Sequence, residues 1–114
     1  MPKYMLLLHE SPTAFKGLSP GEIQAIVQQY SDWRRRLEKE DRFVAGQKLR
    51  TDGRHLRRHG TEVAVTDGPY GEAKEVLGGY FIITAESYEH AVELARSGPH
   101  LERGTLEIRQ IEFE

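Results

Sequence analysis

Hydrophobic residues are grouped along this chain in segments that predict alternating strands and helices. Tyr4–His9 is almost entirely apolar, which predicts a strand that is covered on both faces. Val76–Thr84 predicts a second apolar strand, and the missing side chains of Gly78 and Gly79 inside it indicate a bulge or a close approach by another group. Four further extended segments are predicted: 43–49, 55–60 as an edge strand or hairpin arm, 62–66 as a half-buried strand, and 105–113.

Helical spacing of apolar residues follows a clear start signal at Ser19. Ser19 suits the N-cap, Pro20 suits the first helical position, and Glu22 completes a capping box. Apolar residues then recur every three or four positions to about residue 40, which predicts a helix with one buried face. Trp33 lies on that face and is expected to be a core residue.

A second, shorter helix is predicted over 88–97, with Ser87 as its cap. Gly98 is expected to end it in the left-handed conformation. Its inward face is predicted to consist of Tyr88, Ala91, Val92 and Ala95.

The order strand, long helix, strand, edge hairpin, strand, helix, strand defines the fold class. It is the α+β, split βαβ pattern of ferredoxin-like folds, with an antiparallel sheet and helices on one face. With 114 residues the chain is expected to form one domain, 1–114. Two helices cover one sheet face only, so we expect a homodimer that pairs sheet against sheet.

Composition excludes several classes of function. Sixteen basic and eighteen acidic residues give a formal charge of −2, which argues against a nucleic-acid-binding groove. Cysteine is absent, so disulfides, thiolate catalysis and zinc–thiolate sites are excluded. The apolar run Met5–Leu8 is too short for a signal sequence or a membrane span, so a cytoplasmic location without a membrane partner is expected. No His, Asp and Glu set has metal-ligand spacing, and we expect neither a metal nor a cofactor.

The segment Thr66–Tyr80 holds the densest set of chemical groups. Asp67-Gly68-Pro69 predicts a turn in which the carboxylate accepts from nearby N–H groups and Gly68 adopts a positive φ. Tyr70, Lys74 and Tyr80 are expected around and just after this turn. Asp67 is either an acid–base group or a residue that only stabilises its own turn.

The connection from His9 to Leu18 is long for a link between a strand and a helix, and such loops often cover a site. Phe15 and Leu18 are expected to anchor it on the core. His9 is either a hydrogen-bonded structural histidine or a partner of Asp67.

Five stretches of this chain carry a family resemblance: KYMLLLH, LSPGEI, TDGPYGEAKEVLGGYFII, ESYEHAVELA and GTLEIRQI. Together they resemble the YCII-related proteins, in the branch named for its D-G-P-F motif, with Tyr70 in place of the usual Phe. The resemblance implies a single YCII-related/DGPF domain of ferredoxin-like fold that dimerises as an α/β barrel, in bacterial cytoplasmic proteins. It also implies frequent encoding beside extracytoplasmic-function sigma factors. A His–Asp pair has been suggested for small members, but the first predicted helix here contains no histidine.

Two functions follow as hypotheses. The first is a small-molecule-binding homodimer with acid–base activity on a small organic substrate, in a pocket between sheet and helices. Its candidate catalytic residues are Asp67 and His9, and its candidate ligand-binding residues are Tyr70, Lys74, Tyr80 and Arg109, with Lys74 and Arg109 facing an anionic ligand. The alternative is a non-catalytic regulatory or interaction module whose partner is an extracytoplasmic-function sigma factor. The first hypothesis requires that Asp67 converge with His9 or Tyr80 on a pocket.

Overall fold

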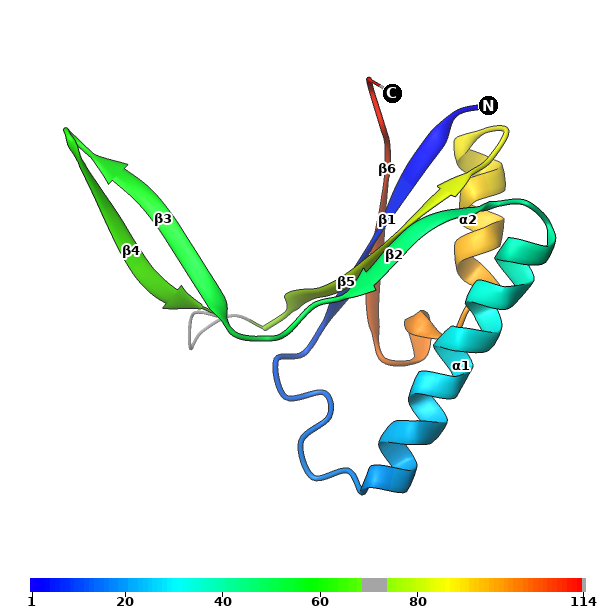
Figure 1. Ribbon diagram of the computed structural model, residues 1–114, viewed down its shortest axis with the longest axis horizontal. Coiled ribbons are helices and arrows are strands. Elements are labelled where there is room, and N and C mark those ends of the chain that lie inside the picture. Colours follow the sequence, from blue (N-terminus) through cyan, green and yellow to red (C-terminus); the bar gives the residue numbers. More distant parts are fainter. Residues whose placement is uncertain (69–73, 114) are drawn as a thin grey trace.

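The computed structural model describes residues 1–68 and 74–113 of the chain (Figure 1). Within these residues, six strands and two α-helices follow one another in the predicted order, and a short 3₁₀ helix, η1, that was not predicted lies before the last strand. Their bounds are β1 Lys3–Glu10, α1 Pro20–Lys39, β2 Phe43–Lys48, β3 Gly53–His59, β4 Glu62–Gly68, β5 Val76–Thr84, α2 Tyr88–Arg96, η1 His100–Glu102 and β6 Gly104–Gln110.

Four strands form the main sheet in the order β2-β5-β1-β6, and each neighbouring pair is antiparallel. This is the strand order of a ferredoxin-like split βαβ fold, so the predicted α+β class and its antiparallel sheet are confirmed. The pairing of β1 with β5 shifts by one residue, because Leu8 pairs with Gly79 while His9 pairs with Leu77. Gly78 is therefore the bulged residue, as its position in the sequence predicted.

The core lies between one face of this sheet and both helices (Figure 1). Buried and partly exposed residues alternate along β1, so only one of its faces is covered within the chain; the predicted burial of both faces is wrong for this protomer. Trp33 of α1 is fully buried and stacks on Phe81 of β5, with 4.7 Å between ring centroids. The other buried apolar residues are Tyr4, Leu6, Leu8, Leu37, Ile83, Ala85, Ala91 and Ala95.

The helix starts agree with the sequence signals. Ser19 accepts a hydrogen bond from the Glu22 N–H, and the Glu22 side chain accepts one from the Ser19 N–H, which completes the capping box. These bonds lower the pKa of the Glu22 carboxyl group. Ser87 caps α2 by accepting from the His90 N–H.

Two details of α2 differ from the prediction. Tyr88 and Val92 are 45% and 38% exposed, because the nine-residue helix buries only the narrow stripe of Ala91 and Ala95. Gly98 does not have a positive φ. It is required for another reason, since a Cβ at this position would overlap the indole ring of Trp33.

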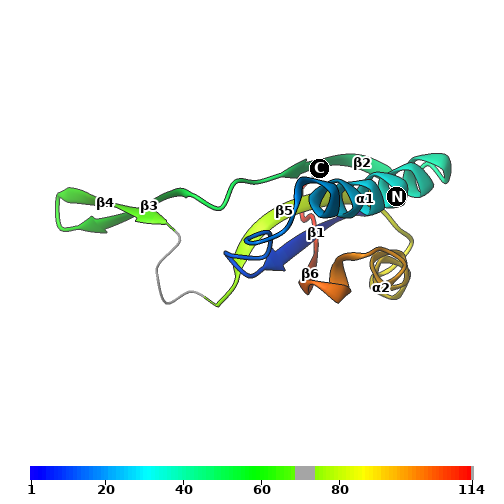
Figure 2. The same cartoon turned by 90° about the horizontal axis from the view of Figure 1, so that it is seen from below.

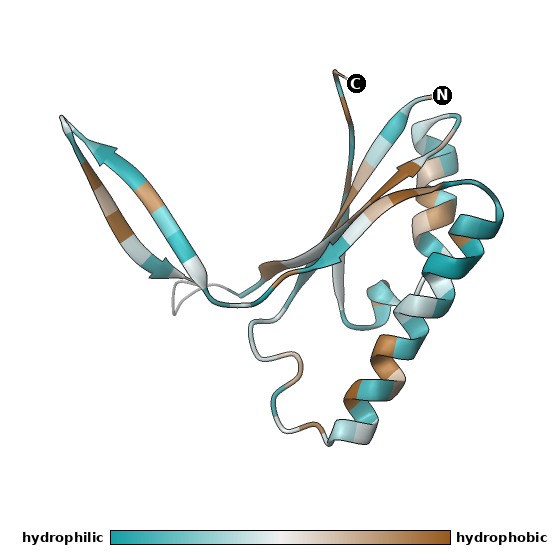
Figure 3. Ribbon diagram, in the orientation of Figure 1, coloured by the Kyte–Doolittle hydropathy of each residue, from teal (hydrophilic) through white to brown (hydrophobic). Residues whose placement is uncertain are grey.

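Strands β3 and β4 form a separate two-stranded hairpin, here called the arm (residues 53–68), which projects from the body (Figures 1 and 2). All of β3 is exposed, and Leu56 and Val65 of the arm are 68% and 58% exposed. Figure 3 shows apolar positions on both strands of this hairpin, among polar ones. The prediction of a hairpin is confirmed, but the prediction that the second strand is half-buried is wrong, because no other layer of the described chain covers the arm.

The arm also explains the extended shape of the molecule. The radius of gyration is 16.1 Å, whereas a compact domain of this length has about 13 Å. At the other end of the chain, β6 stops at Gln110. The apolar residues Leu106 and Ile108 alternate along this strand, whereas Ile111 and Phe113 fall on the opposite phase because the strand has ended before them. Phe113 is 85% exposed. Within residues 1–68 and 74–113, neither helix combines the length and apolar composition needed to cross a lipid bilayer.

Candidate functional site

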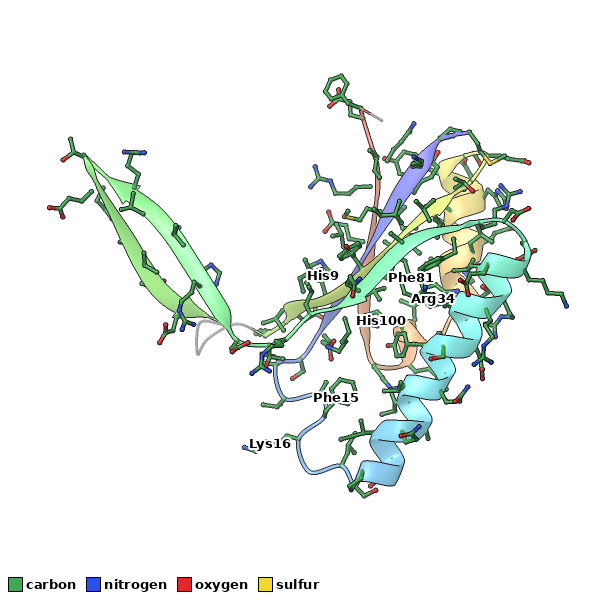
Figure 4. The ribbon with its side chains drawn as sticks, in the orientation of Figure 1. His9, Phe15, Lys16, Arg34, Phe81 and His100 are labelled. Atoms are coloured by element: carbon green, nitrogen blue, oxygen red, sulfur yellow. The ribbon has the colours of Figure 1, made fainter. Side chains whose placement is uncertain are left out.

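A cavity of about 540 Å³ lies between α1, the loop after β1 and the helix-facing side of the sheet. Its size is within the range of small-molecule sites. Figure 4 shows Phe15, Arg34, Phe81 and His100 around this region, each from a different element. The lining residues are Leu8, Glu10, Phe15, Ile23, Ile26, Val27, Tyr30, Ser31, Arg34, Gly46, Gln47, Lys48, Gly78, Gly79, Phe81 and His100.

Most of the cavity wall is apolar, and six of its sixteen lining residues belong to α1. Ile23, Ile26 and Val27 lie on the helix face that the sequence predicted to be buried. Val27 is nevertheless 51% exposed, because this end of α1 faces the cavity instead of the core. The helix periodicity thus identified the correct face, but the N-terminal half of that face lines a cavity.

Glu10 is the buried acid of the cavity. It continues the alternation of Tyr4, Leu6 and Leu8 on β1 and therefore points toward the helices, where it is only 6% exposed. Its Oε1 atom lies 3.2 Å from Lys48 Nζ on β2. A Cβ at position 78 would overlap the Glu10 carboxylate, so the glycine in the bulge makes room for this side chain.

Lys48 is fully occupied by protein acceptors. Its ammonium group donates to Glu10 Oε1 at 3.2 Å and to the carbonyls of Leu49 and Gly78 at 3.0 Å each. The same ammonium lies 5.5 Å from the ring centroid of Phe15, which holds the loop after β1 against the sheet. Because an ammonium has three protons, these three bonds use its donors.

Tyr30 and His100 form a second polar group on the cavity wall. The Tyr30 hydroxyl lies 2.8 Å from His100 Nδ1, and His100 Nε2 lies 2.8 Å from the carbonyl oxygen of His9. A carbonyl only accepts, so a neutral imidazole here carries its proton on Nε2 and accepts from Tyr30 at Nδ1. Burial raises the pKa of the Tyr30 hydroxyl, and the charge of Glu10 raises it further against the opposing effect of Arg103.

Arg34 is the cation of the outer wall. Its guanidinium lies 4.4 Å from the ring centroid of Phe43, and its Nε is 3.7 Å from Glu38, one turn further along α1. The side chain is 50% exposed. Arg34 therefore lies toward solvent, whereas Glu10 lies at the inner end of the cavity.

The residues predicted from the sequence lie elsewhere. Asp67 is in β4 of the arm, where its side chain is 87% exposed and pairs with Arg54 at 3.3 Å. Asp67 pairs with Arg54 of β3, and Gly68 has no positive φ, contrary to the prediction. The rest of the predicted turn, from Pro69 on, lies outside the described residues. The missing side chain of Gly68 instead accommodates the His55 ring, which would be 2.8 Å from an added Cβ.

His9, Tyr80 and Arg109 point to the open face of the sheet, opposite the cavity. His9 Nε2 lies 3.4 Å from Glu107 on β6. Tyr80 pairs with Leu7 and Arg109 with Met5, both on the open-face phase of β1. Lys74 is exposed, and Tyr70 lies outside the described residues. Neither His9 nor Tyr80 converges with Asp67 on the cavity under α1.

A second cavity of about 540 Å³ lies at the foot of the arm. His9 and Gly68 line it, but Asp67 does not. Its other lining residues come from the link before the arm, from the start of β3 and from residues 75–77, and they include the exposed pair of Arg50 and Asp52, whose hydrogen bond lowers the pKa of Asp52. This cavity has no buried ionisable group comparable to Glu10.

Sequence reasoning missed Glu10, Lys48 and His100. The burial of Glu10 could have been predicted, because Glu10 is an acid that continues the buried alternation of an apolar strand. The predicted strand ends at His9 and so leaves Glu10 out. Lys48 and His100 reach the site through the packing of β2 and η1, which no local pattern indicates. In the described parts of the chain, no three His, Asp or Glu side chains lie close enough to hold a metal ion.

Comparison with known proteins places this fold in a family. The family model of the YCII-related domain matches residues 2–113. The chain therefore belongs to the YCII-related domain family. No curated protein matches the sequence.

Proposed function

We propose that this protein binds a small organic molecule in the cavity under α1, with Glu10 as the polar anchor at its inner end. The observation that carries the proposal is a buried carboxylate on the wall of a mostly apolar cavity. Burying a charge is costly, and Lys48 offsets this cost only in part because its own side chain is 57% exposed. A buried carboxylate in a cavity is therefore a candidate functional group.

The same geometry supports acid–base activity. Glu10 can accept a proton from a bound molecule, and the Tyr30 hydroxyl, which donates its own proton to His100, can accept a hydrogen bond from the same molecule. The low exposure of Glu10 strengthens its interaction with a bound molecule. The candidate pair is therefore Glu10 and Tyr30, on β1 and α1.

A metabolite screen by native mass spectrometry and thermal shift tests the proposal. We expect a ligand that stabilises the wild type and the Asp67→Asn variant equally and binds Glu10→Gln at least tenfold more weakly. Asp67→Asn is the matched control, because it removes an equally charged but exposed carboxylate. A ligand that is lost with Asp67→Asn and kept with Glu10→Gln would contradict the proposal and return the site to the arm.

We also propose that two copies pair through the open sheet face as an α/β barrel. Met5, Leu7 and Ile82 leave an apolar surface there, and Val44 beside them is 45% exposed. Sedimentation should give a dimer at micromolar concentration, and Leu7→Glu should shift it to a monomer. Gln24→Glu, on the exposed side of α1, is the control and should leave the dimer intact. A monomeric wild type would refute this proposal.

The exposed apolar face of the arm supports a second candidate, a regulatory or interaction module. Leu56 and Val65 face each other across the hairpin, and Val63 on the same face is 48% exposed. A partner protein that covers them is lost in the double variant Leu56→Ser, Val65→Ser, whereas binding in the cavity is retained. The sigma-factor partner, the branch with the D-G-P-F motif and the cytoplasmic location stay predictions from the sequence.

A further inference from the structure

The inner end of the cavity presents hydrogen-bond acceptors. Lys48, the only cation that contacts Glu10 in the described chain, uses its three donors on Glu10 and on two backbone carbonyls. It has no proton left for a ligand. A carboxylate or phosphate at this end would therefore find no donor from Lys48, although Lys48 carries the positive charge.

Glu10 has an unused acceptor at the same place. Its Oε1 atom accepts from Lys48, while Oε2 makes no hydrogen bond within the described residues. Among those residues no fully buried side-chain oxygen lacks a partner, so Oε2 keeps a solvent-accessible surface. Because Glu10 is only 6% exposed and lines the cavity, that surface is on the cavity side.

Tyr30 adds a second acceptor. With His100 neutral, its Nε2 proton is donated to the His9 carbonyl, and the Tyr30 hydroxyl must donate to His100 Nδ1. The proton of Tyr30 is thus directed to His100, so the hydroxyl can only accept from a ligand. Arg103 lies within hydrogen-bonding reach of the same oxygen, which leaves one lone pair for that ligand. Glu10 and Tyr30 therefore both favour a ligand group that donates a hydrogen bond.

We propose that the cavity selects a molecule with an apolar body and a hydrogen-bond donor at its inner end, above all a protonated amine, and rejects the carboxylate of the same shape. This inference rests on the proposed function and names its ligand class. An N⁺–H donor to Glu10 Oε2 forms a charge-assisted hydrogen bond, which is stronger than a neutral one. A carboxylate would instead be repelled by Glu10 and by the Tyr30 lone pairs. Arg34 would favour an anion, but it lies toward solvent on the outer wall.

Four probes that differ only at the polar end test this proposal: 2-phenylethylamine, 2-phenylethanol, 3-phenylpropanoate and propylbenzene. Their dissociation constants are measured by NMR titration of the ¹⁵N-labelled protein. We expect the amine to bind at least tenfold more tightly than the carboxylate, with the alcohol between them. Carboxylate binding as tight as that of the amine would overturn the inference. Equal binding of all four would overturn the ligand class and leave the proposed cavity function standing, and binding by none of them would contradict both.

The variant Glu10→Gln sharpens the test. Its amide oxygen can still accept from Lys48, which turns the amide N–H₂ toward the cavity in place of Oε2. We expect the preference to reverse, with 3-phenylpropanoate now bound more tightly than the amine and propylbenzene unchanged. Glu107→Gln, a carboxylate on the open face, is the control and should keep the wild-type order. Far-UV circular dichroism checks that Glu10→Gln folds. If it does not, Tyr30→Phe serves instead and should weaken the alcohol severalfold relative to propylbenzene, and no change there would overturn the role of Tyr30.

Discussion

The body of this protein and its arm are built from similar strands but are stabilised in different ways. In β1 every second residue is buried against two helices, whereas in β3 every residue is exposed. A two-stranded hairpin alone is marginally stable in water, because it has no second layer to cover its apolar face. The body therefore supplies the folding free energy of the protomer, and the arm depends on the body or on a partner.

The acid that is most conspicuous in the sequence is also not the acid that lines the candidate site. The most recognisable stretch of the sequence, Thr66–Tyr80, contains Asp67 at the foot of the arm, and the Asp67 carboxylate is 87% exposed. Among the described residues, the buried carboxylate is Glu10, in the body. The two acids differ in burial, in partner and in their distance from an apolar cavity, so they can be tested against each other.

The largest expected difference is in packing. Trp33→Ala removes a fully buried indole that stacks on Phe81 and should lower the free energy of unfolding by about 3–5 kcal/mol. Leu56→Ala removes an apolar side chain that is 68% exposed on the arm and should change it by less than about 0.5 kcal/mol. Urea denaturation of both variants at one protein concentration provides the measurement. An equal loss in the two variants would mean that the arm is packed as tightly as the body.

The next difference concerns two glycines. Gly78→Ala places a Cβ on the Glu10 carboxylate and should cost about 1–3 kcal/mol, because the carboxylate must leave Lys48. Gly53→Ala in the arm meets no atom within 4 Å and should change stability by less than about 0.5 kcal/mol. Thermal unfolding of the two variants checks this. A stable Gly78→Ala protein would show that Glu10 can leave its position at little cost.

The ion pairs give a smaller difference. Lys48→Met leaves Glu10 buried without its partner and should cost about 1–2 kcal/mol, less than for a fully buried pair because Lys48 is 57% exposed. Arg54→Met breaks the exposed pair with Asp67 and should cost less than about 0.5 kcal/mol. A double variant Glu10→Gln, Lys48→Met should recover part of the first loss. Failure to recover any of it would show that Lys48 acts through its carbonyl contacts alone.

The smallest effect is expected at alkaline pH. Burial raises the pKa of Tyr30 in the folded protein, so the unfolded chain loses this proton first as the pH rises. Stability from Tyr30 is therefore complete below about pH 10, the ordinary value of tyrosine, and decreases above it. Tyr30→Phe should lack this part of the alkaline decrease in urea denaturation midpoints. The same slope in both proteins would contradict the burial of the hydroxyl.

The elements of the fold could be predicted because they depend on local patterns. The capping box at Ser19, the apolar alternation of Tyr4–His9 and the glycine pair at residues 78 and 79 each act within a few residues. The predictions that were wrong concern residues whose surroundings are set by contacts with residues far away in the sequence. Gly98 is a glycine because of Trp33, and the exposure of Val27 follows from a cavity that three elements enclose.

The candidate site could be predicted less well, for the same physical reason. Asp67 was conspicuous because its neighbours Gly68 and Pro69 mark a local motif. Glu10 gains its properties from Lys48 on β2 and from the bulge at Gly78, neither of which adjoins it in sequence. The only local signal for the burial of Glu10 is the alternation of buried residues along β1. The predicted strand ends at His9, one residue before Glu10.

The most direct test of ligand binding under α1 is the location of bound ligand in the wild-type protein. Titration of the ¹⁵N-labelled protein with 2-phenylethylamine, followed by amide chemical shifts, compares the body with the arm in one experiment. We expect the largest shifts at Tyr30, Ser31 and Gly79, which line the cavity under α1, and no significant shift over residues 53–68. Shifts that are largest at Gly53, Arg54 and Gly68, beside the second cavity, would contradict it.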